Sequence, residues 1–242
     1  MTRFDGRTPE QLRAIKLEPE IFAHADGSVL FSLGKTQVLC AVNLTKDVPA
    51  FMRGKNNSWL TAEYALLPAA TNMRTTRESV SGKRQGRSVE ISRLIGRVLR
   101  CCVDLEGIGE YTITIDCDVL NADGGTRCTA ICGAQAALNL AMHYWLEAGI
   151  FKKSILKTQL AAVSAGSQDG TILLDLDAIE DNNIHDDFNF VLTHDNTIIE
   201  IQGTAEQKPI SWQQFDDMRK LAYVGVQQLS VFIAQQTGPV IS

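Results

Sequence analysis

The stretch YTITIDCDVLNADGGTRCTAICGAQAALNLAMHYWLE (residues 111–147) contains a strand pattern and a helix pattern joined by two glycines. From Tyr111 to Leu120 apolar and polar residues alternate, which is typical of a strand with one buried face. After Gly124 and Gly125 the chain is rich in alanine and apolar nearly all round, which predicts a buried helix running to about Glu147. We therefore expect a strand, a tight turn and a buried helix in succession.

Outside this stretch, strand patterns outnumber helix patterns. The sequence predicts a hairpin over 27–44, strands over 58–67, 156–164, 171–176, 188–193 and 197–202, and helices over 88–103 and 211–236. Since strands and helices do not alternate regularly, the pattern favours an α+β fold over a doubly wound sheet.

The composition is that of an ordinary globular protein of 242 residues, enough for one large or two small domains. No apolar run approaches the roughly 20 residues needed to cross a bilayer. The amino terminus has no apolar signal region, so we expect a cytoplasmic protein with no membrane contact. The six cysteines form no CxxC pair, and in that compartment we expect them to be reduced and structural.

Charge is distributed unevenly along the chain. The net charge is −5, yet residues 74–100 carry eight arginines and lysines against two glutamates. Residues 165–206 carry ten carboxylates and no lysine or arginine. Because salt screens distant charge, such a basic stretch can attract a polyanion to an otherwise acidic protein.

The densest acidic segment is DLDAIEDNNIHDDFN (residues 175–189), with six carboxylates. It is not an EF-hand loop, because Glu180 occupies the sixth position, where the sharp turn needs glycine. A solvated acidic loop is the usual explanation for such a run, and composition alone favours it.

NADGGTR (residues 121–127) has the pattern of a phosphate site. At a junction of strand and helix, the first helical N–H groups have no partner in the helix, and the helix dipole adds positive potential. An arginine fork such as that of Arg127 matches a phosphate edge. The alternative is a glycine turn in which Thr126 only caps the helix. Arg87 follows Gly86 at a second expected helix start, where the alternative is a surface arginine.

These segments occur together in a known family. From about residue 5 to residue 235 the chain resembles the RNase PH family of phosphorolytic 3′-exoribonucleases, which trim tRNA precursors. The blocks that carry the resemblance are DGR (5–7), GSVLFSLGKTQVLC (27–40), WLTAEYALLP (59–68), GRSVEISRLIGRVLR (86–100), DCDVLNADGGTRCTAICG (116–133), LDLDAIEDNNIHDDFN (174–189) and EIQGTAE (200–206).

The resemblance implies the RNase PH-type fold, in which mixed sheets are packed with helices and which is akin to the second domain of ribosomal protein S5. It implies one catalytic domain over residues 1–242 and a homohexamer, a trimer of dimers. By position it implies phosphate-binding residues Arg87, Gly125, Thr126 and Arg127. It further implies two catalytic aspartates that hold a divalent metal such as Mg²⁺, Asp181 and Asp187, and RNA-contacting residues Arg74 and Arg77.

The chemistry implied is phosphorolysis, in which inorganic phosphate attacks the terminal phosphodiester and a nucleoside diphosphate leaves. No protein nucleophile is needed, in keeping with four histidines that form no evident triad. The other four acids of the cluster are expected to be turn or surface residues. Two rival functions stay open, namely a non-catalytic ring subunit of an exosome-like assembly and a hydrolytic metal-dependent nuclease.

Overall fold

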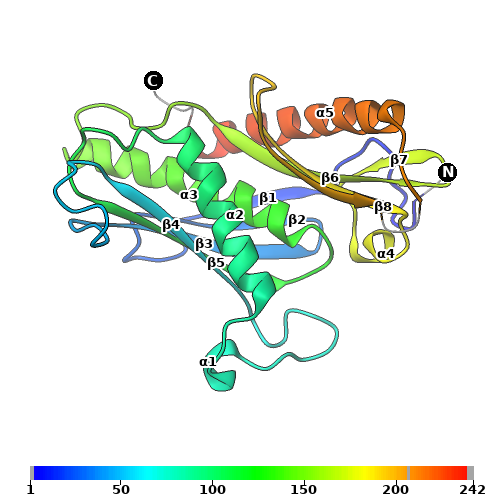
Figure 1. The fold of residues 1–242 in the computed structure, drawn as a ribbon, viewed down its shortest axis with the longest axis horizontal. Helices are drawn as coiled ribbons and strands as arrows, with labels where there is room; N and C mark the ends of the chain where they lie inside the picture. Colours follow the sequence, from blue (N-terminus) through cyan, green and yellow to red (C-terminus); the bar gives the residue numbers. More distant parts are fainter. Residues whose placement is uncertain (1–2, 206–207, 239–242) are drawn as a thin grey trace.

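The computed structural model describes residues 3–205 and 208–238, which form two β-sheets packed with helices (Figure 1). The first sheet has the strand order β1-β2-β3-β5-β4. Its strands are β1 (Ile15–Pro19), β2 (Gly27–Leu33), β3 (Thr36–Thr45), β4 (Trp59–Leu66) and β5 (Thr112–Asn121). Only β4 and β5 pair in parallel; the other neighbours are antiparallel.

The second sheet is antiparallel throughout, with the order β7-β6-β8-β9. Its strands are β6 (Leu160–Gln168), β7 (Thr171–Leu174), β8 (Asp186–Thr193) and β9 (Ile198–Ala205). The helices are α1 (Glu78–Ser81), α2 (Gly86–Cys102), α3 (Thr126–Glu147), α4 (Ala178–Asp181) and α5 (Trp212–Thr237).

Helix α3 lies between the two sheets, since it packs against β2 and β3 on one side and β6 on the other. Its residues are buried nearly all round, as its alanine-rich sequence predicts. Helix α5 packs on β6, β7 and β8 of the second sheet, and α2 packs along the edge strand β4 (Figure 1). One cluster of buried apolar side chains includes residues of both sheets and α3.

The α+β class is confirmed, and most expected elements are present. The strand expected over 156–164 starts four residues late, at Leu160. The preceding segment bonds instead to the end of α2, through Lys157 N–H to the Cys102 carbonyl and Asp104 N–H to the Ile155 carbonyl. Strand β1 is not among the expected strands, although Ile15 and Leu17 alternate with Lys16 and Glu18. The helices α1 and α4 are single turns, too short to show a helical period.

All six cysteines are free, as expected, and five are buried. No helix in the described ranges is both long and apolar enough to span a bilayer. The assignment of residues 1–242 to one catalytic domain stays a prediction, and its residues 1–2, 206–207 and 239–242 lie outside the described ones.

Candidate active site

Two helices begin at the same place, and their first turns form the basic side of the site. The N-cap of α3 is Gly125 and that of α2 is Gln85, and neither helix has a side-chain cap. The two starts touch, because Arg87 Nη2 donates to Thr126 Oγ1 at 3.4 Å. Both helix N-termini therefore contribute positive potential and first-turn N–H groups at one location, which suits an anion.

Thr126 is the first residue of α3 rather than its cap, so the interpretation of this threonine as a helix cap is wrong. Its hydroxyl oxygen also accepts a hydrogen bond from the Tyr64 hydroxyl at 3.0 Å. Burial raises the pKa of Tyr64 further than the Thr126 hydrogen bond and nearby Arg87 lower it, so Tyr64 stays a neutral donor. The threonine is thereby held between β4 and α2.

The glycine turn before α3 packs directly against the acidic segment. Gly124 has φ +77°, and a Cβ there would lie 2.5 Å from the Asp177 carbonyl carbon and 2.7 Å from the Leu176 carbonyl oxygen. Only glycine allows both this backbone conformation and this approach. The turn and the acidic segment, about 50 residues apart in sequence, are therefore neighbours in space.

A buried arginine fixes this contact. Arg13 binds the Asp175 carboxylate with two nitrogens of its guanidinium. Nη2 donates to Oδ1 at 2.6 Å, and Nε donates to Oδ2 at 3.0 Å. Its Nη1 also donates to the Asp123 carbonyl at 2.6 Å, beside the glycine turn. Sequence reasoning missed Arg13, because its partners are 110 and 162 residues away.

The acidic segment is not a solvated loop. We expected its four acids other than Asp181 and Asp187 to be turn or surface residues, and the expectation of a surface position is wrong. These acids are 1–8% exposed: Asp175, Asp177, Glu180 and Asp186. Asp177 and Glu180 form a capping box at the start of α4. Glu180 pairs with buried Arg3 at 2.5 Å, and Asp186 accepts from the Ser167 N–H at 2.8 Å. They are scaffold, and each contacts a specific partner.

The two remaining acids of the segment line a cavity. Asp181 is the last residue of α4, and Asp187 is the second residue of β8. Both line a mostly polar cavity of about 470 Å³ together with Arg87 and Arg127. An adjoining cavity of about 330 Å³ shares Arg87 and Asp181 with it and adds Gly125 and Thr126. The structure thus brings all six expected phosphate and metal residues to one location.

Arg127 is held by the second sheet. Its Nη1 donates to Gln202 Oε1 on β9 at 2.7 Å and lies 3.6 Å from Glu90 Oε1 on α2. Gln202 also lines the polar cavity, as does Asn189, which contacts Asp187 Oδ2 at 3.4 Å. Sequence reasoning assigned no role to either amide, although both lie in blocks that carry the resemblance.

Arg74 and Arg77 are exposed on the segment that leads into α1, and they line neither cavity. Their neighbours Thr75 and Thr76 line the smaller one. The two arginines therefore lie beside the site, where they can contact a ligand that extends out of it.

The donor set fits a magnesium ion. In the described ranges no three His, Cys, Asp or Glu side chains lie together closely enough to hold a metal. Mg²⁺ commonly binds one or two carboxylates and completes its shell with water and substrate phosphates, so two aspartates in a polar cavity suffice. The same cavity offers Arg87 and Arg127 for the phosphates.

Two family models match the chain, and solved structures share its fold. The family described as "3′ exoribonuclease family, domain 1" matches residues 11–142, and its "domain 2" matches residues 158–225. The fold is similar to that of rice (Oryza sativa) Rrp46, with a TM-score of 0.79 and 20% identity over 97% of this chain and 100% of that one.

Two archaeal structures are also similar, each at 20% identity. A chain of the Archaeoglobus fulgidus exosome "with RNA bound to the active site" has a TM-score of 0.78 over 94% of this chain and 91% of its own. A chain of an archaeal exosome core has a TM-score of 0.75 over 96% and 90%. With both family domains matched in order and the RNase PH-type fold in place, the chain belongs to the 3′ exoribonuclease (RNase PH) family.

Proposed function

We propose that the chain is a phosphorolytic 3′-to-5′ exoribonuclease that trims the 3′ ends of tRNA precursors. The observation that carries the proposal is the cavity that Arg87, Arg127, Asp181 and Asp187 line together. It offers cationic groups for two phosphates and carboxylates for a metal, and phosphorolysis needs both.

In the proposed reaction an oxygen of inorganic phosphate forms a bond to the terminal phosphorus of the RNA. The bond from that phosphorus to the 3′-oxygen of the preceding nucleotide breaks. A nucleoside diphosphate leaves, and the shortened RNA keeps a 3′-hydroxyl after gaining a proton. The reverse reaction adds a nucleotide and releases phosphate.

The side chains have separate tasks in this step. Arg87, Arg127 and the first-turn N–H groups of α3 hold the attacking phosphate, and this fixes its distance and direction. Gln202 and Glu90 hold the Arg127 guanidinium in place before the phosphate arrives. Asp181 and Asp187 would hold Mg²⁺, which when bound neutralises charge on the transferring phosphoryl group.

RNA beyond the terminal nucleotide would contact Arg74 and Arg77 at the edge of the site. We include in the proposal a homohexamer, a trimer of dimers, and a cytoplasmic location. The shared fold supports the assembly part of the proposal, because the similar archaeal chains come from structures described as exosomes.

A non-catalytic ring subunit is the second candidate, and the similarity to exosome chains is what favours it. Such a subunit has no need of a complete site. Here two arginines, two aspartates and an uncapped helix start line the same space, which favours catalysis.

The test is a product assay on an RNA with a single-stranded 3′ end, with and without inorganic phosphate and with and without Mg²⁺. We expect nucleoside diphosphates only when both are present. Monophosphates formed without phosphate would identify a hydrolytic nuclease. Intact RNA under all four conditions would identify a non-catalytic subunit.

A further inference from the structure

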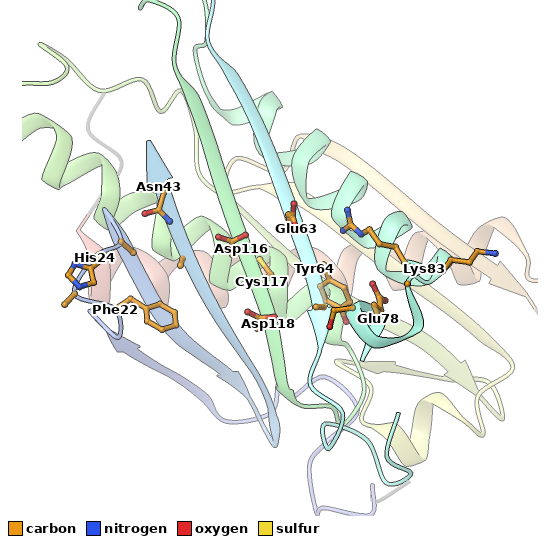
Figure 2. Close-up of a pocket in the computed structure, with 17 residues that line it drawn as sticks. Phe22, His24, Asn43, Glu63, Tyr64, Glu78, Lys83, Asp116, Cys117 and Asp118 are labelled. Carbon is orange, nitrogen blue, oxygen red and sulfur yellow. The ribbon is translucent and has the colours of Figure 1, made fainter. Parts of the chain in front are cut away.

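Tyr64 lies in the core, and its hydroxyl reaches the candidate active site from the core side. Side chains of β4 alternate between more and less buried positions, and Tyr64 is 2% exposed. Figure 2 shows it with its register partner Cys117 of β5, among residues that line a separate cavity of about 850 Å³ over the first sheet. Tyr64 lines neither cavity of the candidate active site. Any effect of Tyr64 on a ligand there must therefore pass through another residue.

That residue is Thr126, which does line the smaller of those two cavities. A threonine hydroxyl can accept two hydrogen bonds and donate one. Tyr64 donates to Thr126 Oγ1 at 3.0 Å, and Arg87 Nη2 donates to the same oxygen at 3.4 Å. An arginine can only donate, and burial raises the pKa of Tyr64, so the phenol keeps its proton. Both acceptor positions of the Thr126 hydroxyl are therefore occupied.

The proton of the Thr126 hydroxyl is left for a third partner. In the described part of the chain no acceptor takes it. Thr129, one turn further along α3, differs in this respect. Its hydroxyl donates to the Gly125 carbonyl at 3.0 Å, so its proton is used within the helix. Of these two threonines at the start of α3, only Thr126 keeps a donor for a ligand.

We propose that Tyr64 is a positioning residue that makes Thr126 a fixed donor to a phosphate oxygen in this cavity. With Tyr64 and Arg87 both donating to its oxygen, the Thr126 hydroxyl directs its proton into the cavity. Donation to that oxygen also polarises the O–H bond and strengthens it as a donor. A donor fixed before the ligand arrives favours a negatively charged oxygen over a P–OH group at that position.

The inference rests on the proposed function, because it takes inorganic phosphate as the ligand of this cavity. The alternative is that Tyr64 only fills space in the core. Phenylalanine has the same ring without the hydroxyl, so Tyr64→Phe keeps the packing and removes the hydrogen bond. Equilibrium binding of phosphate tests the inference without depending on catalysis.

The experiment is a double-mutant cycle on the full chain, with inorganic phosphate titrated by calorimetry into Tyr64→Phe, Thr126→Val and the double variant. We expect Thr126→Val to raise the dissociation constant about 10- to 100-fold, the scale of one hydrogen bond to a charged group. Tyr64→Phe should raise it about 5- to 10-fold, because the hydroxyl stays but its proton is no longer directed. In the Thr126→Val background Tyr64→Phe should change it by less than about twofold, since no hydroxyl is left to position.

Tyr111→Phe is the matched control. Tyr111 precedes β5, at the other end of that strand from the glycine turn, and within the described ranges its phenol oxygen has no hydrogen-bond partner. This variant should bind phosphate as the wild type does. Urea unfolding of every variant shows whether it is folded.

Two results would make Tyr64 a packing residue and overturn the inference. One is a folded Tyr64→Phe variant that binds phosphate as tightly as the wild type. The other is a loss of the same factor with and without the Thr126 hydroxyl. A wild type that binds no phosphate would overturn the inference and the proposed function together. The expected cycle in a protein that releases no nucleoside diphosphates would support the positioning role and overturn only phosphorolysis.

Discussion

Arg127 connects helix α3, on which it lies, with helix α2 and strand β9. Its guanidinium is held by Gln202 of β9 and Glu90 of α2. It lines the same cavity as Asp181 and Asp187. A guanidinium held in this way can bind phosphate without first being reorganised. The residue therefore carries the phosphate-binding part of the proposed function.

Replacing Arg127 with alanine should lower the turnover number by about 10²–10³, the scale for losing one preorganised donor. The measurement is the initial rate of phosphate-dependent shortening at saturating phosphate. Arg53→Ala, which removes an exposed arginine that pairs with the exposed Asp47, should leave the rate unchanged. An Arg127→Ala enzyme that keeps most of its activity would refute the assigned role.

At the residue scale, the sequence predicted the charged side chains that line the cavity. It did not predict the residues that hold those side chains in position. Gly125, Thr126 and Arg127 can be found because a local motif carries them. Arg13 and Gln202 cannot, because their roles depend on contacts that only the folded chain makes.

At the scale of elements, the site depends on how the glycine turn before α3 packs against the start of α4. The backbone approach at Gly124 leaves no room for a Cβ, whereas Gly82, at a similar φ of +67°, has nothing within 4 Å. Both glycines have a positive φ, and only at Gly124 would an added Cβ meet neighbouring backbone atoms.

Gly124→Ala should therefore lower the free energy of unfolding more than Gly82→Ala does. The expected difference is about 1–3 kcal/mol, the typical cost of overpacking. Urea unfolding of both variants measures the difference. Equal losses would show that the turn tolerates a methyl group and that the packing against Asp177 is not tight.

Element types were predictable where the pattern was long, as for α3, α5 and the hairpin of β2 and β3. The start of β6 and the helix α4 were not. The first depends on which partner the 154–159 segment bonds to, and the second is a single turn held by the Asp177–Glu180 capping box.

At the scale of the whole molecule, buried ion pairs connect residues 3–7 with the acidic segment at 175–189. Arg3 and Glu180, 177 residues apart, bond through two atoms each, and Arg7 lies 3.4 Å from the same carboxylate. Breaking one partner of such a pair leaves a buried charge without compensation. The composition of the acidic segment suggested a solvated loop. Through Glu180 the segment instead forms buried ion pairs with residues more than 170 positions away in the sequence.

This contact should make stability depend on pH. Burial alone would raise the pKa of Glu180, but the hydrogen bonds from Arg3 and the Asp177 N–H, with the charges of Arg3 and Arg7, lower it overall. A carboxyl whose folded pKa is depressed contributes stability above its unfolded pKa, about 4.3, and loses it as pH falls through the folded value.

Between about pH 5 and pH 3 the free energy of unfolding of the wild type should thus fall more steeply than that of Glu180→Gln. Exposed Glu10→Gln serves as the control and should follow the wild type. Parallel curves for wild type and Glu180→Gln would contradict the assigned pairing.

The central claim is that inorganic phosphate is the nucleophile in the cavity of Arg87, Arg127, Asp181 and Asp187. The most direct measurement supplies radiolabelled inorganic phosphate with unlabelled RNA and Mg²⁺ and follows the label. We predict that it appears in the terminal phosphoryl group of the released nucleoside diphosphates, in step with shortening of the RNA. RNA that shortens while all the label stays in inorganic phosphate would contradict the account.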